Sequence, residues 1–215
     1  MTYLQLVNKV LVRLRESTVD TVAQNPYSAL IGEFVNDAKR LVEDAWDWSA
    51  LRTTLSVTTT SDIFNYVLTG SGNRAKILDV VNDTSNFFMK YQTQHWFNDK
   101  FLNSSPAVGS PMYYTFNGVD SNGDTAVDVY PVPNGVLSLR FNCVLRTAEL
   151  SEDTDEVTIP TLAIIHIAFA MALRERGETG GQSAAEAYSY AQQVLSDAIA
   201  LDASKHPEET IYAPV

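Results

Sequence analysis

The sequence predicts an α+β protein: a four-helix bundle, made of two N-terminal and two C-terminal helices, interrupted by an antiparallel β domain. Near both ends of the 215-residue chain, apolar residues recur at spacings of three and four, as on one face of a helix. The middle of the chain instead alternates apolar and polar residues and is rich in Thr and Val, which is typical of strands. Neither pair of helices can bury its apolar stripe alone, so we expect the two pairs to pack together.

Residues 1–52 are predicted to form the first two helices of the bundle. The first helix runs from Tyr3 to about Glu16, and Thr2 with Gln5 forms a capping-box pattern at its start. The second begins at Pro26, which suits the first helical position because its missing N–H has no helical partner there, and Asn25 before it is a natural N-cap. We expect this helix to continue to about Leu51 and to bury a long apolar stripe, which comprises Leu30, Phe34, Val35, Ala38, Leu41, Val42, Ala45, Trp48 and Leu51.

Residues 53–158 are predicted to form the inserted β domain, with one short helix near residues 94–101. The expected strands cover residues 53–60, 63–68, 76–82, 112–116, 125–132 and 136–146. Three Asn-Gly pairs begin at Asn117, Asn122 and Asn134. Asn-Gly is a strong hairpin signal because both residues tolerate a positive φ, so each pair predicts a hairpin turn.

Residues 159–204 are predicted to supply the last two helices, and residues 205–215 a C-terminal tail. The helix that follows Pro160 is apolar nearly all round, which places it in the middle of the bundle, and Gly177 suits its C-terminal cap. Ser183 with Glu186 forms a capping box for the last helix, about Ala184 to Ala203. The stripe of that helix comprises Ala184, Ala187, Tyr188, Ala191, Val194, Leu195, Ala198 and Leu201.

The chain is acidic, with a net charge of −11, and the acidity is concentrated near the C-terminus. Residues 148–215 contain three basic and twelve acidic side chains. A protein that grips the nucleic acid backbone is expected to be basic, because it must neutralise phosphates. Cys143 is the only cysteine, which excludes an intrachain disulfide and a Cys-based zinc site. The apolar run Leu162–Leu173 is too short to span a membrane, so we expect a soluble protein. We also expect neither a cofactor nor a metal.

Several motifs superficially resemble functional sites but lack the required spacing. A phosphate-binding loop needs a Gly immediately before its Lys. The segment Gly70–Lys76 lacks a Gly at that position, so we expect a turn. The segment Asp120–Asp124 has its Gly at the wrong position for a calcium loop and is expected to be a hairpin turn. His166 lies in an apolar helix without a second metal ligand, so it is interpreted as a core histidine.

The order of the elements and several local sequences resemble the head-to-tail adaptor (connector) proteins of tailed bacteriophages, in particular podophage-like versions with an inserted β domain. The resemblance rests on the segments 27–48 (YSALIGEFVNDAKRLVEDAWDW), 109–116 (GSPMYYTF), 129–133 (VYPVP) and 157–160 (VTIP), the last preceded by an acidic loop. It implies a structural virion protein at the head–tail junction, made in the host cytoplasm. It also implies a dodecameric ring beneath the portal that extends the DNA channel and offers a platform to a downstream tail or nozzle protein.

The resemblance implies no catalytic residues, but it does imply that the C-terminal extension reaches the portal. The candidate portal-docking residues are Pro207, Ile211, Tyr212, Pro214 and Val215. The acidic loop is a candidate for a lumen-facing or interface position, through Glu152, Asp153, Asp155 and Glu156. An acidic channel wall would repel the DNA phosphates and so let DNA pass without adhering. At physiological salt this repulsion acts over ~8 Å. Trp46 and Trp48 are candidates for packing between subunits or domains, with Trp46 expected against the β domain.

Two other functions remain open at the level of sequence. A small hydrolase or nuclease with a helical frame would need His166 as a general base beside a nucleophile and an acid. A ligand-binding β module supported by helices would bind sugars through Tyr113, Tyr114 and Trp96.

Overall fold

The computed structural model describes residues 1–102, 105–177 and 182–205, which fold into two compact units. The helical unit combines residues 1–51 with the chain from Thr147 onward, and the β unit is Arg52–Arg146. The sequence predicts a β domain over residues 53–158, whereas the β unit ends at Arg146. The return boundary lies earlier because the backbone after Arg146 bonds to the helices rather than to the sheets.

The helical unit contains the four long predicted helices and two short 3-10 turns. Both predicted N-terminal caps of the first two helices are present: Thr2 with Gln5 forms a capping box, and Asn25 accepts from the Ser28 amide. Gly177 follows the third long helix with a φ of 64°, a left-handed conformation that glycine adopts without strain. The elements are α1 (Tyr3–Arg13), η1 (Val22–Gln24), α2 (Pro26–Ala45), η2 (Ser49–Leu51), α4 (Thr161–Glu175) and α5 (Gln182–Ala203).

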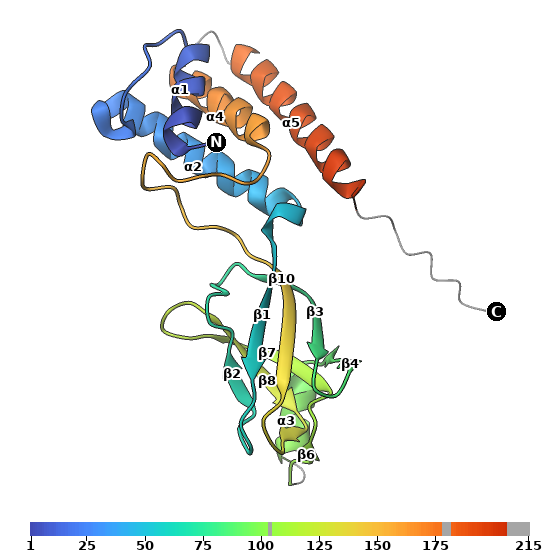
Figure 1. Cartoon of the computed structure of the whole chain (residues 1–215). Coiled ribbons are helices and arrows are strands. Elements are labelled where there is room, and N and C mark those ends of the chain that lie inside the picture. The colour runs from blue at the N-terminus through green and yellow to red at the C-terminus, as the bar shows by residue number, and fades with distance from the viewer. Residues whose placement is uncertain (103–104, 178–181, 206–215) are drawn as a thin grey trace, which may run out of the picture. The chain divides into compact units, whose positions relative to one another are not determined.

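Helix α4 lies at the centre of the helical unit, as its apolar sequence predicts. It contacts α1, α2 and α5, and α1 also contacts α2 (Figure 1). Eight of its fifteen residues are buried, on several sides of the helix. Helix α5 lies along α4 and buries a narrower line, centred on Ala191 and Leu195. The fold is therefore α+β, with α4 as the shared packing partner of the helices.

Helix α2 is shorter than predicted, and its buried face is rotated from the predicted stripe. It ends at Ala45, and Trp46 has extended backbone. Ile31, Val35 and Val42 are buried, whereas Leu41 is 48% exposed. The stripe could not be located from hydrophobicity alone, because α2 carries apolar residues on two adjacent rows and only one row packs on α1 and α4.

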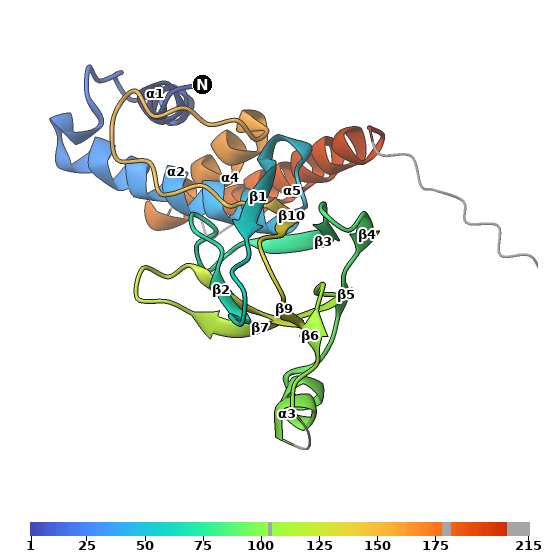
Figure 2. The same cartoon turned by 60° about the horizontal axis from the view of Figure 1, so that its bottom comes forward.

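The β unit consists of two four-stranded sheets and a small two-stranded pair (Figure 2). The first sheet has the order β1-β10-β3-β4 and is antiparallel throughout. The second has the order β2-β8-β7-β5, and its β5–β7 pair is parallel, as is the β6–β9 pair. The strands are β1 (Arg52–Thr58), β2 (Asn65–Val67), β3 (Lys76–Asn82), β4 (Phe87–Phe88), β5 (Lys90–Tyr91), β6 (Val108–Gly109), β7 (Tyr113–Val119), β8 (Thr125–Tyr130), β9 (Val132–Pro133) and β10 (Ser138–Val144).

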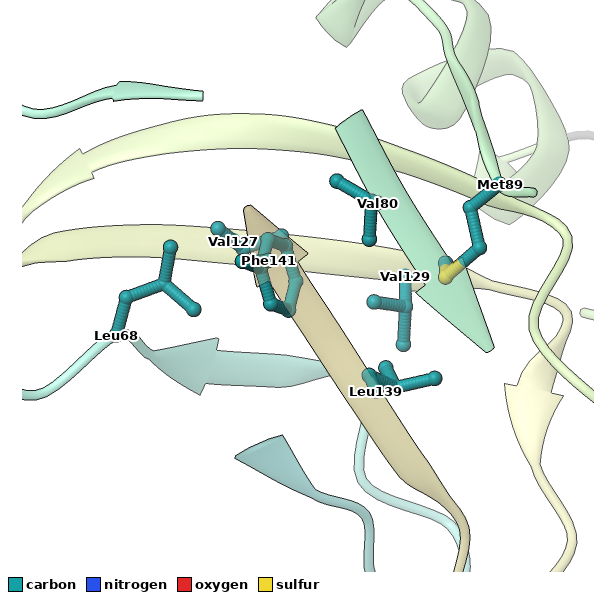
Figure 3. Packing of buried hydrophobic residues seen from close by; sticks show 7 residues of the cluster. All are labelled: Leu68, Val80, Met89, Val127, Val129, Leu139 and Phe141. Atoms are coloured by element: carbon teal, nitrogen blue, oxygen red, sulfur yellow. The ribbon is translucent and has the colours of Figure 1, made fainter. Parts of the chain in front are cut away.

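The core of the β unit is formed by apolar side chains from both sheets (Figure 3). Alternate residues of β8 and β10 point into it, as period-two patterning requires. Its buried members are Leu68, Val80, Met89, Val127, Val129, Leu139 and Phe141.

Only one of the three Asn-Gly pairs forms a hairpin turn. Gly123, with a φ of 85°, lies in the turn between the paired strands β7 and β8. Gly118 instead lies within β7, where the register shifts between Phe116 and Val119, so this pair forms a bulge. Asn134 and Gly135 connect β9 to β10, which do not pair with each other. The hairpin predictions at Asn117 and Asn134 are therefore wrong, because Asn-Gly also suits bulges and crossovers between sheets.

The short predicted helix, α3 (Gln94–Leu102), packs on the second sheet through aromatic rings. Trp96 lies 4.9 Å from Tyr113 and 5.4 Å from Tyr130, between ring centroids. Phe97 is buried beside Tyr130. These offset and edge-to-face contacts attach a helix that is too short to be stable alone.

Candidate functional site

The acidic loop belongs to a return segment, Thr147–Val157, that leads from the β unit back into α4. One polar row on α2 holds its first residues. Asn36 exchanges two hydrogen bonds with the backbone of Leu150, at 3.0 and 2.9 Å. Lys39 donates to the carbonyl oxygens of Thr147 and Ala148, and Glu43 accepts from the Thr147 hydroxyl at 2.6 Å. The return segment is therefore fixed along α2 by side chains three and four residues apart.

Lys39 and Glu43 form a buried ion pair beneath this segment. Their charged atoms lie 3.0 Å apart, and their side chains are 5% and 1% exposed. Such a pair is stable only when further hydrogen bonds compensate the lost hydration. The Thr147 and Ala148 groups supply those bonds, so the ion pair and the return segment depend on each other.

The acidic residues of the segment divide into two classes. Asp153 accepts from the Val22 amide, and Asp155 accepts from the amides of Ser151 and Glu152, which lower the pKa of Asp155. Glu152 and Glu156, by contrast, are exposed. The four candidate residues are thus near one another in sequence, but only these two glutamates present their side chains to solvent.

The same segment closes over the start of the chain. The amides of Tyr3 and Leu4 donate to the carbonyl oxygens of Asp155 and Asp153, and Val157 donates to Met1. Burial, with the charges of Glu33 and Asp153, raises the pKa of Tyr3 to about 12. A groove of about 510 Å³ runs beside Tyr3, and its acidic lining residues are Glu33, Glu149, Glu152 and Asp153. Within the described part of the chain, no group of three or more His, Cys, Asp or Glu side chains is placed to hold a metal ion.

A second polar cluster fixes the end of α5, from which the tail begins. Asp202 is buried and accepts hydrogen bonds from the Ser49 hydroxyl and amide, from the Trp46 indole and from Lys205. Burial opposes its ionisation, but the bonds from Ser49 and Lys205 outweigh that effect and lower the pKa of Asp202 to about 2. The base of the tail is therefore bonded to the segment that follows α2.

Trp46 and Trp48 have different surroundings. Trp46 is half-buried and donates to Asp202 at 3.2 Å. Trp48 is buried and donates to the Val42 carbonyl at 2.6 Å. Their expected packing between subunits or domains stays a prediction. The candidate portal-docking residues Pro207, Ile211, Tyr212, Pro214 and Val215 lie outside the described residues.

His166 is half-buried between α4 and α5, with its ring 4.9 Å from that of Tyr190. Burial, and to a lesser degree the charge of Arg13, lower its pKa. Its neighbours here are thus an aromatic ring and a cation rather than the acid that a catalytic histidine needs for orientation.

The three aromatic residues considered for sugar binding do not share one surface. Trp96 and Tyr113 pack together outside the second sheet, whereas Tyr114 lies beside Phe141 of the core. Neighbouring residues of a strand point to opposite faces, which separates Tyr113 from Tyr114.

The segment that resembled a phosphate loop is a turn. The amides of Gly70 and Gly72 donate to the Asp124 carboxylate at 3.1 and 2.9 Å, and these bonds lower the pKa of Asp124. Asp120 in turn accepts from the amides of Asn122 and Asp124 within the β7–β8 hairpin. An internal carboxylate therefore occupies the place of a bound anion.

Sequence reasoning missed Lys39, Glu43 and Asp202. For the first two a signal existed in the sequence. Lys39 directly follows Ala38 and Glu43 directly follows Val42, so both lie next to the apolar row of α2. Asp202 also lies one turn after Ala198 of the α5 stripe. It is buried at the end of this stripe, where Leu201 was expected, whereas Leu201 is 69% exposed. A charged residue on the buried side of a helix predicts a buried polar contact.

The chain is thus a helical unit into which a β unit is inserted, and the polar side chains described above are used for internal bonding. The family model described as SU10 adaptor protein matches residues 1–211. The chain therefore belongs to this family of phage adaptor proteins, and its role is that of a structural head–tail adaptor in the virion. No curated protein matches the chain. None of the helices in the described residues is long and apolar enough to cross a bilayer.

Proposed function

We propose that this protein forms a ring, a dodecamer by resemblance to connector proteins, that joins the portal to the tail and extends the DNA channel. The observation that carries the proposal is the family match over residues 1–211, which spans both units and the first part of the tail. In this proposal the four long helices act as one bundle that forms the wall of the ring. The platform for a downstream tail or nozzle protein lies on the β unit.

The acidic composition supports a conduit that DNA passes without adhering. The side chains of Glu152 and Glu156 are exposed, whereas those of Asp153 and Asp155 accept backbone hydrogen bonds, so we place the two glutamates toward the lumen or the portal contact. Repeating an acidic subunit around a channel repels phosphates within a Debye length of about 8 Å.

The C-terminal tail is proposed to dock on the portal. It starts at Lys205, whose position is fixed by the hydrogen bond to Asp202 at 3.1 Å. The sequence that follows contains two prolines and the apolar residues Ile211, Tyr212 and Val215. A segment of this composition suits folding on a partner surface.

Electron microscopy of the full chain mixed with its cognate portal protein tests the proposal. We expect a ring of density on one end of the portal, with a continuous central channel. A chain truncated after Lys205 is expected to keep its fold and to lose portal binding. Absence of any complex between the full chain and the portal would overturn the proposal, and equal binding by the truncated chain would overturn the role of the tail.

A further inference from the structure

Helix α2 presents a second apolar row that the helical unit leaves uncovered. Leu30, Phe34 and Leu41 recur at helical spacing, next to the buried row. Leu30 and Phe34 are half-buried, and Leu41 is 48% exposed. An amphipathic helix normally buries such a row, so this row is suited to a partner.

The uncovered row continues into an apolar groove between α2, α4 and α5. The groove has a volume of about 460 Å³ and is lined by Leu41, Ala170, Met171, Arg174, Ala184, Ala185 and Tyr188. Tyr188 is 48% exposed. On its outer side the row is bordered by the exposed carboxylates of Glu33 and Asp37. We call Leu41, Met171 and Tyr188, with these two acids, the α2 flank.

A second apolar surface lies on the other side of α5. Tyr190 is 52% exposed and contacts His166, and Leu162, one turn earlier on α4, is 50% exposed. Phe169, three residues after His166, is half-buried. Arg13 of α1 is close enough to lower the pKa of His166, and Lys9 is exposed one turn before it. We call Leu162, Phe169 and Tyr190, with Lys9 and Arg13, the α1 flank.

The two flanks face in different directions. At 100° per residue, Tyr188 and Tyr190 point about 160° apart around α5, one on each side of the buried line through Ala191. Two unlike apolar surfaces on opposite sides of one unit suit head-to-tail association, which closes into a ring when the rotation allows it.

We propose that the α2 flank of one copy docks on the α1 flank of the next copy. The charges at the edges support this occupant: Glu33 and Asp37 border one surface, and Lys9 and Arg13 border the other. Arg174 in the groove is placed to meet an aromatic ring, and the α1 flank offers Tyr190 and Phe169. The inference rests on the proposed ring and specifies the subunit contact within it.

Substitutions at exposed positions test the contact without disturbing the core. Leu41→Lys places a cation opposite Lys9 and Arg13, and Leu162→Glu places an anion opposite Glu33 and Asp37. Each is expected to abolish assembly of the full chain. Assembly of the chain without the portal is measured by analytical ultracentrifugation, and assembly on the portal is measured by counting the bound subunits. Leu102→Lys and Val136→Glu, which are 82% and 76% exposed on the β unit, are the matched controls and should assemble like the original chain.

Mixing the two disrupted variants tests the head-to-tail geometry. Each variant retains one intact flank, and the two introduced charges are opposite in sign, so an equimolar mixture of Leu41→Lys and Leu162→Glu is expected to assemble although neither variant does so alone. A second experiment reverses the charges at the edges of the two flanks. Lys9→Glu and Asp37→Lys should each weaken assembly at least tenfold, and the double variant should recover most of the lost assembly.

The outcomes separate this inference from the proposed function. If the original chain forms rings on the portal and both flank variants do so equally well, the inference is wrong and the adaptor function stands. If the chain assembles through the flanks but binds no portal, the inference stands and the function is wrong. If the chain assembles in neither condition, both are overturned.

Discussion

At the scale of single residues, a few buried polar groups fix the helical unit. Asp202 accepts bonds from Ser49, Trp46 and Lys205 in a buried position, and Lys39 pairs with Glu43 beneath the return segment. Charges are buried at low cost only where such partners are in place, so these residues define the local geometry more narrowly than apolar packing does.

The stability of the chain should depend on Asp202 in a pH-dependent way. The pKa of its carboxyl group lies at about 2, below its ordinary value of 3.8, so ionisation stabilises the fold above about pH 4. This contribution, about 2 kcal/mol, is lost as the pH falls through 2. We expect Asp202→Asn to lower the free energy of unfolding by that amount at pH 7 and by much less at pH 2, measured by urea denaturation.

The exposed residue Asp197 of the same helix provides the control. Asp197→Asn should leave the unfolding curve unchanged at both pH values. Equal effects of the two substitutions, or a loss at Asp202 that does not vary with pH, would contradict this role.

Gly32 allows α1 to approach α2 closely. A Cβ atom at this position would collide with the Tyr3 hydroxyl and with Val22. Alanine normally stabilises a helix relative to glycine, yet overpacking costs about 1–3 kcal/mol. We therefore expect Gly32→Ala to destabilise the chain in thermal unfolding. Adding Tyr3→Phe, which removes the colliding oxygen, should recover part of the loss; a stabilising Gly32→Ala would show that the helices separate at no cost.

At the scale of elements, the return segment is held by α2 rather than by its own regular structure. Lys39→Met removes one partner of a buried pair, which typically costs about 3–5 kcal/mol. We expect this loss in denaturant unfolding, together with faster hydrogen exchange at the Thr147 and Leu150 amides, which bond to Glu43 and Asn36. Arg40→Met changes an exposed neighbour and should alter neither measurement; equal effects would refute the anchoring.

The elements themselves were largely predictable from local signals. Strand β3 has its predicted bounds, and the capping pattern at Thr2 and the cap at Asn25 are present. The end of α2 was predicted too late because Trp48 and Leu51 continue the apolar spacing, although the backbone is already extended at Trp46. Trp48 is buried nonetheless, because burial depends on packing rather than on helical structure.

At the scale of the whole molecule, the acidic loop combines structural and exposed carboxylates. Glu152→Gln with Glu156→Gln is expected to leave stability within about 0.5 kcal/mol, because exposed substitutions rarely change it more. The same variant should retain DNA on the assembled ring in a filter-binding assay, while the original ring retains none. Asp153→Asn with Asp155→Asn should instead destabilise the chain, since both carboxylates accept backbone bonds. Neutralised rings that still ignore DNA would disprove the proposed repulsion.

The sequence by itself determined the α+β class, the order of the elements, the absence of a cysteine framework and the resemblance to connector proteins, because these depend on local periodicity, caps and composition. Only the tertiary structure decided which row of α2 is buried, which acids of the return segment are exposed, and that Asp202 is bonded to the end of α2. The physical reason is that these features arise from contacts between separate elements, such as those of Asp202 with Ser49 and of Asp153 with Val22, whose partners lie far apart in the sequence. Local patterns set the form of each element, whereas burial and pairing depend on which elements meet.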